Sequence, residues 1–227
     1  MNILNIFRKP YLSTLFAMLI LFASCDTYEN DILESDKSIK SNSLNKKSSK
    51  LEDYVANHLI TSSNLETLLL NEDNIDITIL ENSSLYFNDI EELKLMLIEA
   101  KVVKVNEIAD LFWQIQSNTN NFLINSELKQ NEAGLVIEAE INRQFDLMVL
   151  KYTESKSDCA SSCYQSYQNA DFRCRRNMSI ALAASAVSAF FTFGVGTAIG
   201  VGAAGTVFLI CTNDAVNDWR ACQANCK

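Results

Sequence analysis

The chain has 227 residues and a net charge of −9, with only six glycines and one proline. This length suits one or two small domains. So few glycines and prolines favour helices over a turn-rich β fold. The negative charge argues against a nucleic-acid partner, because binding phosphates needs a basic surface. We therefore expect an all-α protein that does not bind nucleic acid.

Residues 1–24 have the pattern of a secretory signal peptide. Arg8 and Lys9 close a short basic start, and residues 11–22 form an apolar run of 12 residues. That run is too short to span a bilayer as a helix, and small residues follow it. The segment Leu-Phe-Ala-Ser-Cys at 21–25 resembles the lipobox of bacterial lipoproteins.

The resemblance implies that the signal is cleaved before Cys25 and that Cys25 carries the lipid. Phe22 departs from the family pattern, which more often has a smaller aliphatic residue at that position. The alternative is an ordinary signal peptide with an incidental cysteine. The cysteine count favours lipidation, because removing Cys25 from seven cysteines leaves six that can pair.

Residues 25–50 are expected to form a lipid anchor and a disordered tether. Five acidic residues and no basic one lie between 26 and 36, which resembles the surface-export signals of some Gram-negative lipoproteins. Residues 37–50 are rich in Ser, Asn and Lys, so we interpret them as a flexible linker. These features predict an exported, lipid-anchored protein at the outer membrane or cell surface of a Gram-negative bacterium.

Residues 51–153 are expected to form a small acidic helical bundle. Between 51 and 150 there are 18 acidic and 5 basic residues. Apolar residues recur at helical spacing, which predicts helices at about 50–61, 63–71, 88–103, 105–124 and 126–153. Asn88 is the expected N-cap of the third helix. Ile75, Ile77 and Ile79 alternate with polar residues, so a short extended piece is an alternative within 72–87.

The bundle carries no recognisable catalytic pattern. His58 is the only histidine of the chain, and a lone histidine is more often a surface or satisfied core residue than a catalyst. There is no metal-binding His-Glu spacing and no Gly-rich phosphate loop. Phe112 and Trp113 fit core or interface packing better than a ligand platform. We expect neither enzymatic activity nor a metal or cofactor.

Residues 154–227 are expected to form a helical hairpin joined by disulfides. The gaps between its six cysteines read 3, 10, 36, 10 and 3 residues, and pairing them from the outside inward gives a constant sum of 385. Two antiparallel helices in constant register would be numbered in this way. The predicted bonds are Cys159–Cys226, Cys163–Cys222 and Cys174–Cys211.

Helix geometry supports the pairing across the hairpin. At 100° per residue, the three cysteines of each helix lie on one narrow face. The facing positions on that inner face are small, namely Ala170 with Ala215, Ala181 with Ala204, Ser185 with Gly200 and Ser188 with Thr197. Small residues allow the close approach that a disulfide needs. Bonds within one helix, or a zinc site, are weaker alternatives. The Cys-x₃-Cys pairs resemble those in helical hairpins of small secreted peptides, which implies no particular activity.

The hairpin has an apolar tip rich in Gly and Ala. No charged residue occurs from 177 to 213, and five of the six glycines lie there. Because the inner face is small, the large apolar side chains point outward and need cover. Either the bundle covers them, or they contact a membrane or a partner. In the second case Gly196 and Gly200 resemble a glycine zipper, and arginines at the base would meet lipid phosphates. The candidate contact residues are Phe190, Phe191, Phe193, Val207, Phe208, Arg173, Arg175 and Arg176.

These features favour a non-enzymatic, surface-anchored lipoprotein that acts as a binding or display module. The alternative is a membrane-active protein, antimicrobial or pore-forming, whose apolar hairpin inserts into a target membrane. Beyond the lipid anchor, the expected partner is a target membrane or a protein at the apolar hairpin.

Overall fold

The computed structural model describes residues 41–82, 86–87, 89–149, 158–194, 198–199 and 201–226. They belong to one compact unit, Lys40–Lys227. The predictions for the signal peptide, for Cys25 and for the acidic segment after it lie outside the described residues. The described part of the chain is all-α apart from one strand pair of two residues each.

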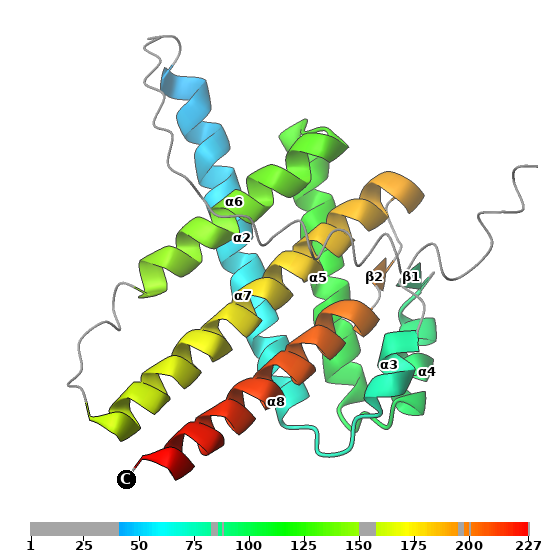
Figure 1. Cartoon of the computed structure of the whole chain (residues 1–227). Helices are drawn as coiled ribbons and strands as arrows, with labels where there is room; N and C mark the ends of the chain where they lie inside the picture. Colours follow the sequence, from blue (N-terminus) through cyan, green and yellow to red (C-terminus); the bar gives the residue numbers. More distant parts are fainter. Residues whose placement is uncertain are drawn as a thin grey trace, which may run out of the picture. The chain divides into compact units, whose positions relative to one another are not determined.

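Five helices and one short strand form the bundle that the acidic segment predicts (Figure 1). Apolar residues line the inner faces of the longer helices, so burying them holds the bundle together. The elements are α2 (Ser41–Leu70), α3 (Ile77–Asn82), β1 (Tyr86–Phe87), α4 (Ile90–Glu99), α5 (Val105–Ser126) and α6 (Gln130–Val149).

The C-terminal segment forms the predicted antiparallel hairpin, in which α7 (Cys159–Phe193) and α8 (Val201–Asn225) run side by side (Figure 1). Asp158 caps α7, because its carboxylate accepts a hydrogen bond from the Ser161 N–H at 2.6 Å. Between the two helices, β2 (Ala198–Ile199) pairs antiparallel with β1. This strand pair joins the Gly/Ala-rich end of the hairpin to the bundle.

The start of the bundle differs from the sequence-based prediction. One continuous helix, α2, replaces the two helices expected at 50–61 and 63–71, and it begins at Ser41. Residues 41–50, expected to belong to the flexible linker, are therefore helical. The reason is physical: no Gly or Pro interrupts the segment, and extending an anchored helix is much easier than nucleating one.

Two details of the middle of the bundle also differ from the prediction. Residues 77–82 form the helix α3 rather than an extended piece, with the Leu80 side chain buried. The N-cap of α4 is Asp89 rather than Asn88. Its Oδ1 accepts hydrogen bonds from the N–H groups of Glu91 and Glu92, both at 2.9 Å.

The bundle and the hairpin share their apolar core. One cluster joins the second half of α2, α3, α4 and α5 to the hairpin through Met178, Leu182 and Phe208. A second cluster joins the first half of α2, α5 and α6 to α7 through Ala183 and Val187. The bundle therefore covers the described apolar side chains of the hairpin in large part, which is the first of the two arrangements considered above.

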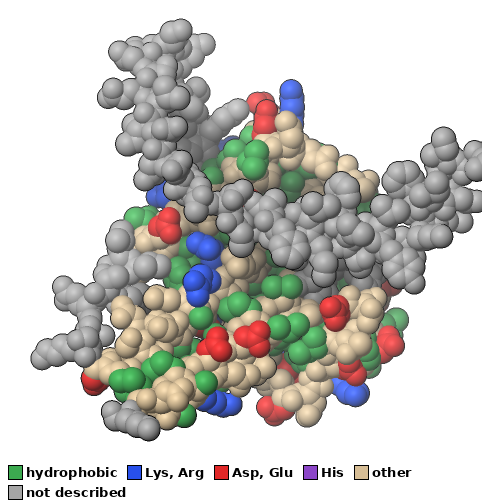
Figure 2. All heavy atoms as spheres, viewed as in Figure 1, with side chains coloured by type: hydrophobic (Ala, Val, Ile, Leu, Met, Phe, Trp, Pro, Cys, Tyr) green, Lys and Arg blue, Asp and Glu red, His purple; other side chains and the backbone are tan. Residues whose placement is uncertain are grey.

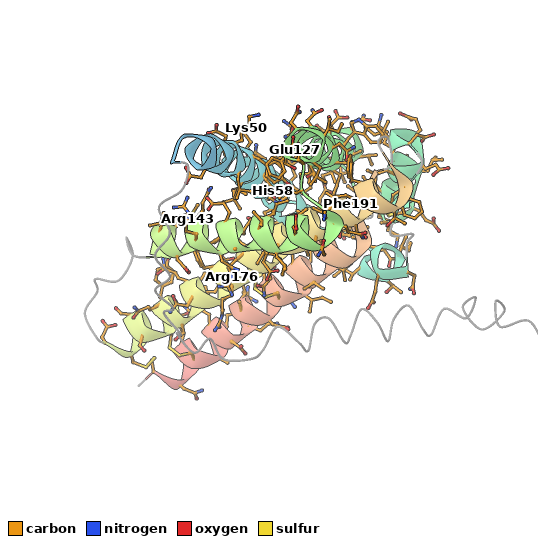
Figure 3. All side chains as sticks on the ribbon, turned by 90° about the horizontal axis from the view of Figure 1, so that it is seen from above. Lys50, His58, Glu127, Arg143, Arg176 and Phe191 are labelled. Atoms are coloured by element: carbon orange, nitrogen blue, oxygen red, sulfur yellow. A yellow bond between two sulfur atoms is a disulfide. The ribbon has the colours of Figure 1, made fainter. Side chains whose placement is uncertain are left out.

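The opposite end of the hairpin extends away from the bundle, toward the lower left in both Figure 1 and Figure 3. We name this end the arm and define it as residues 158–170, which are the N-cap and first part of α7, together with residues 213–226 at the end of α8. Neither apolar cluster contains a residue of the arm. Most of its side chains are exposed. The arm consequently depends on contacts between its own two helices.

Candidate binding surface

Three disulfides join α7 to α8 in the order that the constant sum predicts. The bonds are Cys159–Cys226, Cys163–Cys222 and Cys174–Cys211, with Cα–Cα distances of 5.6, 5.7 and 5.7 Å. These distances are typical of disulfides and shorter than most helix–helix separations. Two of the bonds lie in the arm, where the bundle gives no support. The third lies where the hairpin enters the core.

Small residues on the inner face permit this close approach. Ala204 and Ala215 are buried, and Ala170, Ala181 and Ser185 are half-buried between the helices and their neighbours. The predicted partners Thr197 and Gly200 lie outside the described residues. The agreement of small residues and disulfides along the described inner face explains why the two antiparallel helices stay close together over the length of the arm.

The apolar residues proposed as a membrane or partner contact fall into three groups. Phe208 is 1% exposed and lies in the core, so it is not part of the surface in this structure. Phe190 and Phe191 are half-buried and pack against the second cluster. Phe193 and Val207 are exposed at 56% and 46%. The expected contact surface is therefore reduced, because the bundle covers its centre.

The three arginines at the base of the apolar run also separate. Arg175 forms ion pairs with Glu66 of α2 at 2.9 Å and with Asp171 at 2.8 Å. Its guanidinium group therefore pairs with carboxylates of the protein rather than with lipid phosphates. Arg176 is half-buried, and Arg173 is exposed. No described helix is sufficiently long and apolar to span a membrane.

Three aromatic rings gather between the two helices of the arm. Tyr167 and Trp219 lie 5.3 Å apart, centroid to centroid, and Tyr164 lies 6.2 Å and 6.3 Å from them. These separations are within the range of favourable aromatic pairs. Tyr164 is 49% exposed. The two adjacent disulfides hold the helices that carry these rings.

The rest of the arm surface is polar but nearly uncharged. Its 27 residues include ten Ser, Asn and Gln residues and only four charged ones, Asp158, Asp214, Asp218 and Arg220. In Figure 2, green hydrophobic and tan uncharged atoms cover most of this end of the molecule. Rigid aromatic groups beside Ser and Asn are typical of recognition surfaces such as antibody paratopes. None of the residues predicted to contact a membrane or a partner lies in the arm.

A row of buried polar side chains on α2 lies at the interface with α5 and α7. We name it the polar row: Tyr54, His58, Ser62 and Glu66, at four-residue spacing. The Tyr54 hydroxyl lies 2.8 Å from the Thr119 hydroxyl, and His58 Nε2 lies 2.8 Å from the Ser179 carbonyl oxygen. Because a carbonyl only accepts, His58 Nε2 is the protonated ring nitrogen.

Burial shifts the pKa values of Tyr54, His58 and Glu66 so that the neutral form of each side chain is favoured. It lowers the pKa of His58 to about 4, against the opposing effect of the Ser179 carbonyl. It raises the pKa of Tyr54 to about 12 and that of Glu66 to about 7, although Arg175 stabilises the Glu66 carboxylate. Figure 3 shows His58 within the bundle. The only histidine of the chain is therefore a neutral, hydrogen-bonded core residue.

A small cavity of about 210 Å³ lies between α6 and α7. It is open to solvent, and its volume is below the 300–1,000 Å³ typical of pockets for drug-sized ligands. Its walls carry one charged group, Glu138, and a few polar atoms. We do not regard it as the functional site. The lining residues are Asn131, Gly134, Leu135, Ile137, Glu138, Ile180, Ala183, Ala184 and Val187.

One group of side chains in the described ranges has the spacing of metal ligands. The sulfur atoms of Cys159, Cys163 and Cys226 lie within 4.8 Å of one another. All three take part in disulfides, whereas metal ions bind thiolates. In this oxidised form the group is a pair of adjacent disulfides rather than a metal site.

Comparisons with protein-family models, with curated proteins and with solved structures give no match to this chain. The assignment of a role therefore depends on the geometry described above.

Proposed function

We propose that this protein is an exported, lipid-anchored lipoprotein of a Gram-negative bacterium that acts as a non-enzymatic binding or display module. The arm is its contact surface. The observation that carries this proposal is that two disulfides fix a surface outside the shared core, where the exposed Tyr164 lies against the half-buried Tyr167 and Trp219 among exposed amide side chains.

The proposal accounts for where the disulfides lie. An aromatic surface presented by two helices is useful for recognition only if it is pre-organised, since ordering flexible side chains on binding costs free energy. The core fixes the upper part of the hairpin. Beyond the core, the disulfides Cys159–Cys226 and Cys163–Cys222 do the same for Tyr164, Tyr167 and Trp219.

The cysteine count supports export and anchoring. All six cysteines of the hairpin are paired, which leaves Cys25 as the single cysteine outside the disulfides. Disulfides form and persist in exported proteins, which fits the signal-like start of the chain. Cys25 follows that start directly and has the position that the lipobox resemblance assigns to the lipidated residue.

Replacing Cys25 by serine is expected to abolish lipidation and release the protein from the membrane fraction. A chain without acyl groups loses about 0.8 kcal/mol of membrane affinity for each CH₂ no longer buried. The measurement is incorporation of radiolabelled fatty acid together with cell fractionation. Cys174→Ser is the control for loss of a cysteine and should still be labelled. Equal labelling of the wild type and Cys25→Ser would contradict the anchor.

Tyr164→Ala is expected to weaken binding through the arm at least tenfold, because an exposed aromatic anchor often dominates the free energy of recognition. The probe is a panel of immobilised glycans and extracellular proteins, presented to the purified protein carrying Cys25→Ser. Leu95→Ala is the matched control, since Leu95 is an exposed apolar residue of α4.

Two results would contradict the binding proposal. One is equal loss of binding in Tyr164→Ala and Leu95→Ala, which would place the contact outside the arm. The other is leakage of lipid vesicles caused by the lipid-free protein, without binding to the panel. That result would favour the membrane-active alternative, in which the hairpin leaves the bundle and exposes Leu182 and Phe208.

A further inference from the structure

The two disulfides of the arm are in contact with each other. Cys163 Sγ lies 3.5 Å from Cys226 Sγ, although these two atoms belong to different bonds. Cys159 Sγ lies within 4.8 Å of both. Four sulfur atoms are thus gathered at one place between α7 and α8, and the contact joins the bond nearest the chain end to the next one.

Exposure divides the four cysteines into two types. Cys159 and Cys222 are exposed, whereas Cys163 is buried and Cys226 is half-buried. Each of the two disulfides therefore has one exposed partner and one covered partner. The two covered sulfur atoms are the pair that lies 3.5 Å apart.

This arrangement fits thiol–disulfide exchange. A thiolate attacks one sulfur of a disulfide, a mixed disulfide forms, and the other sulfur leaves as a thiolate that attacks any disulfide within reach. We propose that the two disulfides of the arm form an exchange site for a dithiol reductant, in which attack at either exposed cysteine produces a new Cys163–Cys226 bond. This proposal does not depend on the binding role of the arm.

Attack at Cys222 shows how the bonds change. The reductant's thiolate bonds to Cys222 and releases the Cys163 thiolate. Cys163 then attacks the adjacent Cys226 sulfur, which forms Cys163–Cys226 and releases the Cys159 thiolate. The second thiol of the reductant displaces Cys222 from the mixed disulfide.

Attack at Cys159 follows the mirror-image course and gives the same product. It releases the Cys226 thiolate, which attacks Cys163 and releases Cys222. In both cases two disulfides of the protein break and one forms, and the dithiol becomes a disulfide. The two protons of the dithiol end on Cys159 and Cys222, so the protein gains two electrons and two protons.

The new bond preserves the structure of the arm. The Cys163–Cys226 bond still joins α7 to α8. Once the released protein thiolate has formed this bond, the two helices of the arm remain covalently linked. Two exposed thiols then appear at the arm surface, at Cys159 and Cys222. The third disulfide does not take part, because Cys174 is buried in the core cluster and remote from the exposed end.

Limited reduction of the full chain carrying Cys25→Ser tests the proposal. One equivalent of dithiothreitol is added, free thiols are alkylated, the remaining disulfides are then fully reduced, and the new thiols receive a heavier alkyl label. Fragmentation mass spectrometry locates both labels. The expected result is two early-labelled cysteines per chain, Cys159 and Cys222, with Cys163, Cys226, Cys174 and Cys211 labelled late.

Any other pair of early-labelled cysteines overturns the proposal. Early labels on Cys163 with Cys222, or on Cys159 with Cys226, would show simple reduction of one bond without transfer. Early labels on Cys174 and Cys211 would show that the core bond is the reactive one.

A pair of double variants gives a second, independent test on the oxidised protein. In the chain carrying Cys25→Ser, Cys159→Ser with Cys222→Ser leaves the two sulfur atoms that lie 3.5 Å apart, so this variant should form Cys163–Cys226 and contain no free thiol. Cys163→Ser with Cys226→Ser is the matched control and should retain two free thiols, since Cys222 is outside the 4.8 Å group. Two free thiols in the first variant would contradict the proposal.

Discussion

Replacing Phe208 by aspartate is expected to lower the free energy of unfolding by at least about 4 kcal/mol. Removing a fully buried phenylalanine costs about 3–5 kcal/mol through lost apolar burial and the cavity that remains, and a buried carboxylate adds to that loss. Phe208 is 1% exposed and lies in the cluster shared by the hairpin and the bundle. Urea denaturation of the protein carrying Cys25→Ser measures the effect.

The neighbouring residue provides a matched control. Val207→Asp introduces the same charge one position earlier on α8, where the side chain is 46% exposed, so a change of less than about 1 kcal/mol is expected. If the hairpin acted by inserting into lipid from an uncovered state, Phe208→Asp would leave the urea midpoint almost unchanged and abolish vesicle binding. That pair of results would contradict the shared core.

The disulfide pattern was the most predictable feature of this structure. The constant sum of the cysteine positions favours one set of partners and, with it, the antiparallel direction of the helices. The small residues at Ala204 and Ala215 supply a second, independent indication of the same contact. Both observations are local to the C-terminal segment and need no knowledge of the rest of the fold.

The location of the exposed surface was not predictable in the same way. The sequence shows that the large apolar residues of the hairpin need cover, but not which segment supplies it. Phe208 was expected either to be covered by the bundle or to contact a membrane or partner, and Arg175 was expected to meet lipid phosphates in the second case. Their partners lie on other helices, and Glu66 is 109 positions away from Arg175. Such long-range pairs leave no periodic pattern in the sequence.

The aromatic cluster of the arm was not predicted, because its residues form no sequence motif. Tyr164, Tyr167 and Trp219 are scattered among Ser, Asn and Gln residues, with no motif. Only the fold shows that the bundle ends before this part of the hairpin, which leaves the three rings on an unsupported pair of helices. The short helix α3 was missed for a related reason, since alternating isoleucines in so short a segment fit either a strand or one buried helical turn.

Replacing Arg175 by methionine is expected to destabilise the protein at pH 8 by up to about 1.4 kcal/mol more than at pH 5, because pH 8 lies one unit above the Glu66 pKa of about 7. Arg175 Nη1 lies 2.9 Å from Glu66 Oε2, and the Glu66 side chain is 3% exposed. Without Arg175, an ionised Glu66 would be a buried charge without a counter-charge. At pH 5 the carboxyl group holds a proton and is neutral, so the same loss has little consequence.

The direction of the pH effect follows from the pKa of Glu66. Burial raises this pKa from 4.5 to about 7 in the folded protein, so the folded state binds more protons than the unfolded state between these values. Stability from this group is therefore fully present below about pH 4.5 and is lost as the pH rises through 7. Removing Arg175 raises the pKa further, which deepens the loss at pH 8. The negative charge of Asp171, the other acidic partner of Arg175, also raises the pKa of Glu66.

Urea denaturation at pH 5 and pH 8 tests this expectation with two controls. Arg173→Met removes an exposed arginine two residues away on α7 and should change stability by less than about 0.5 kcal/mol at both pH values. Combining Glu66→Gln with Arg175→Met removes the buried charge as well as its partner, so the difference between pH 5 and pH 8 should largely disappear. An equal loss at both pH values in Arg175→Met would show that the arginine acts through packing of its aliphatic chain, and would exclude charge compensation of Glu66 as its role.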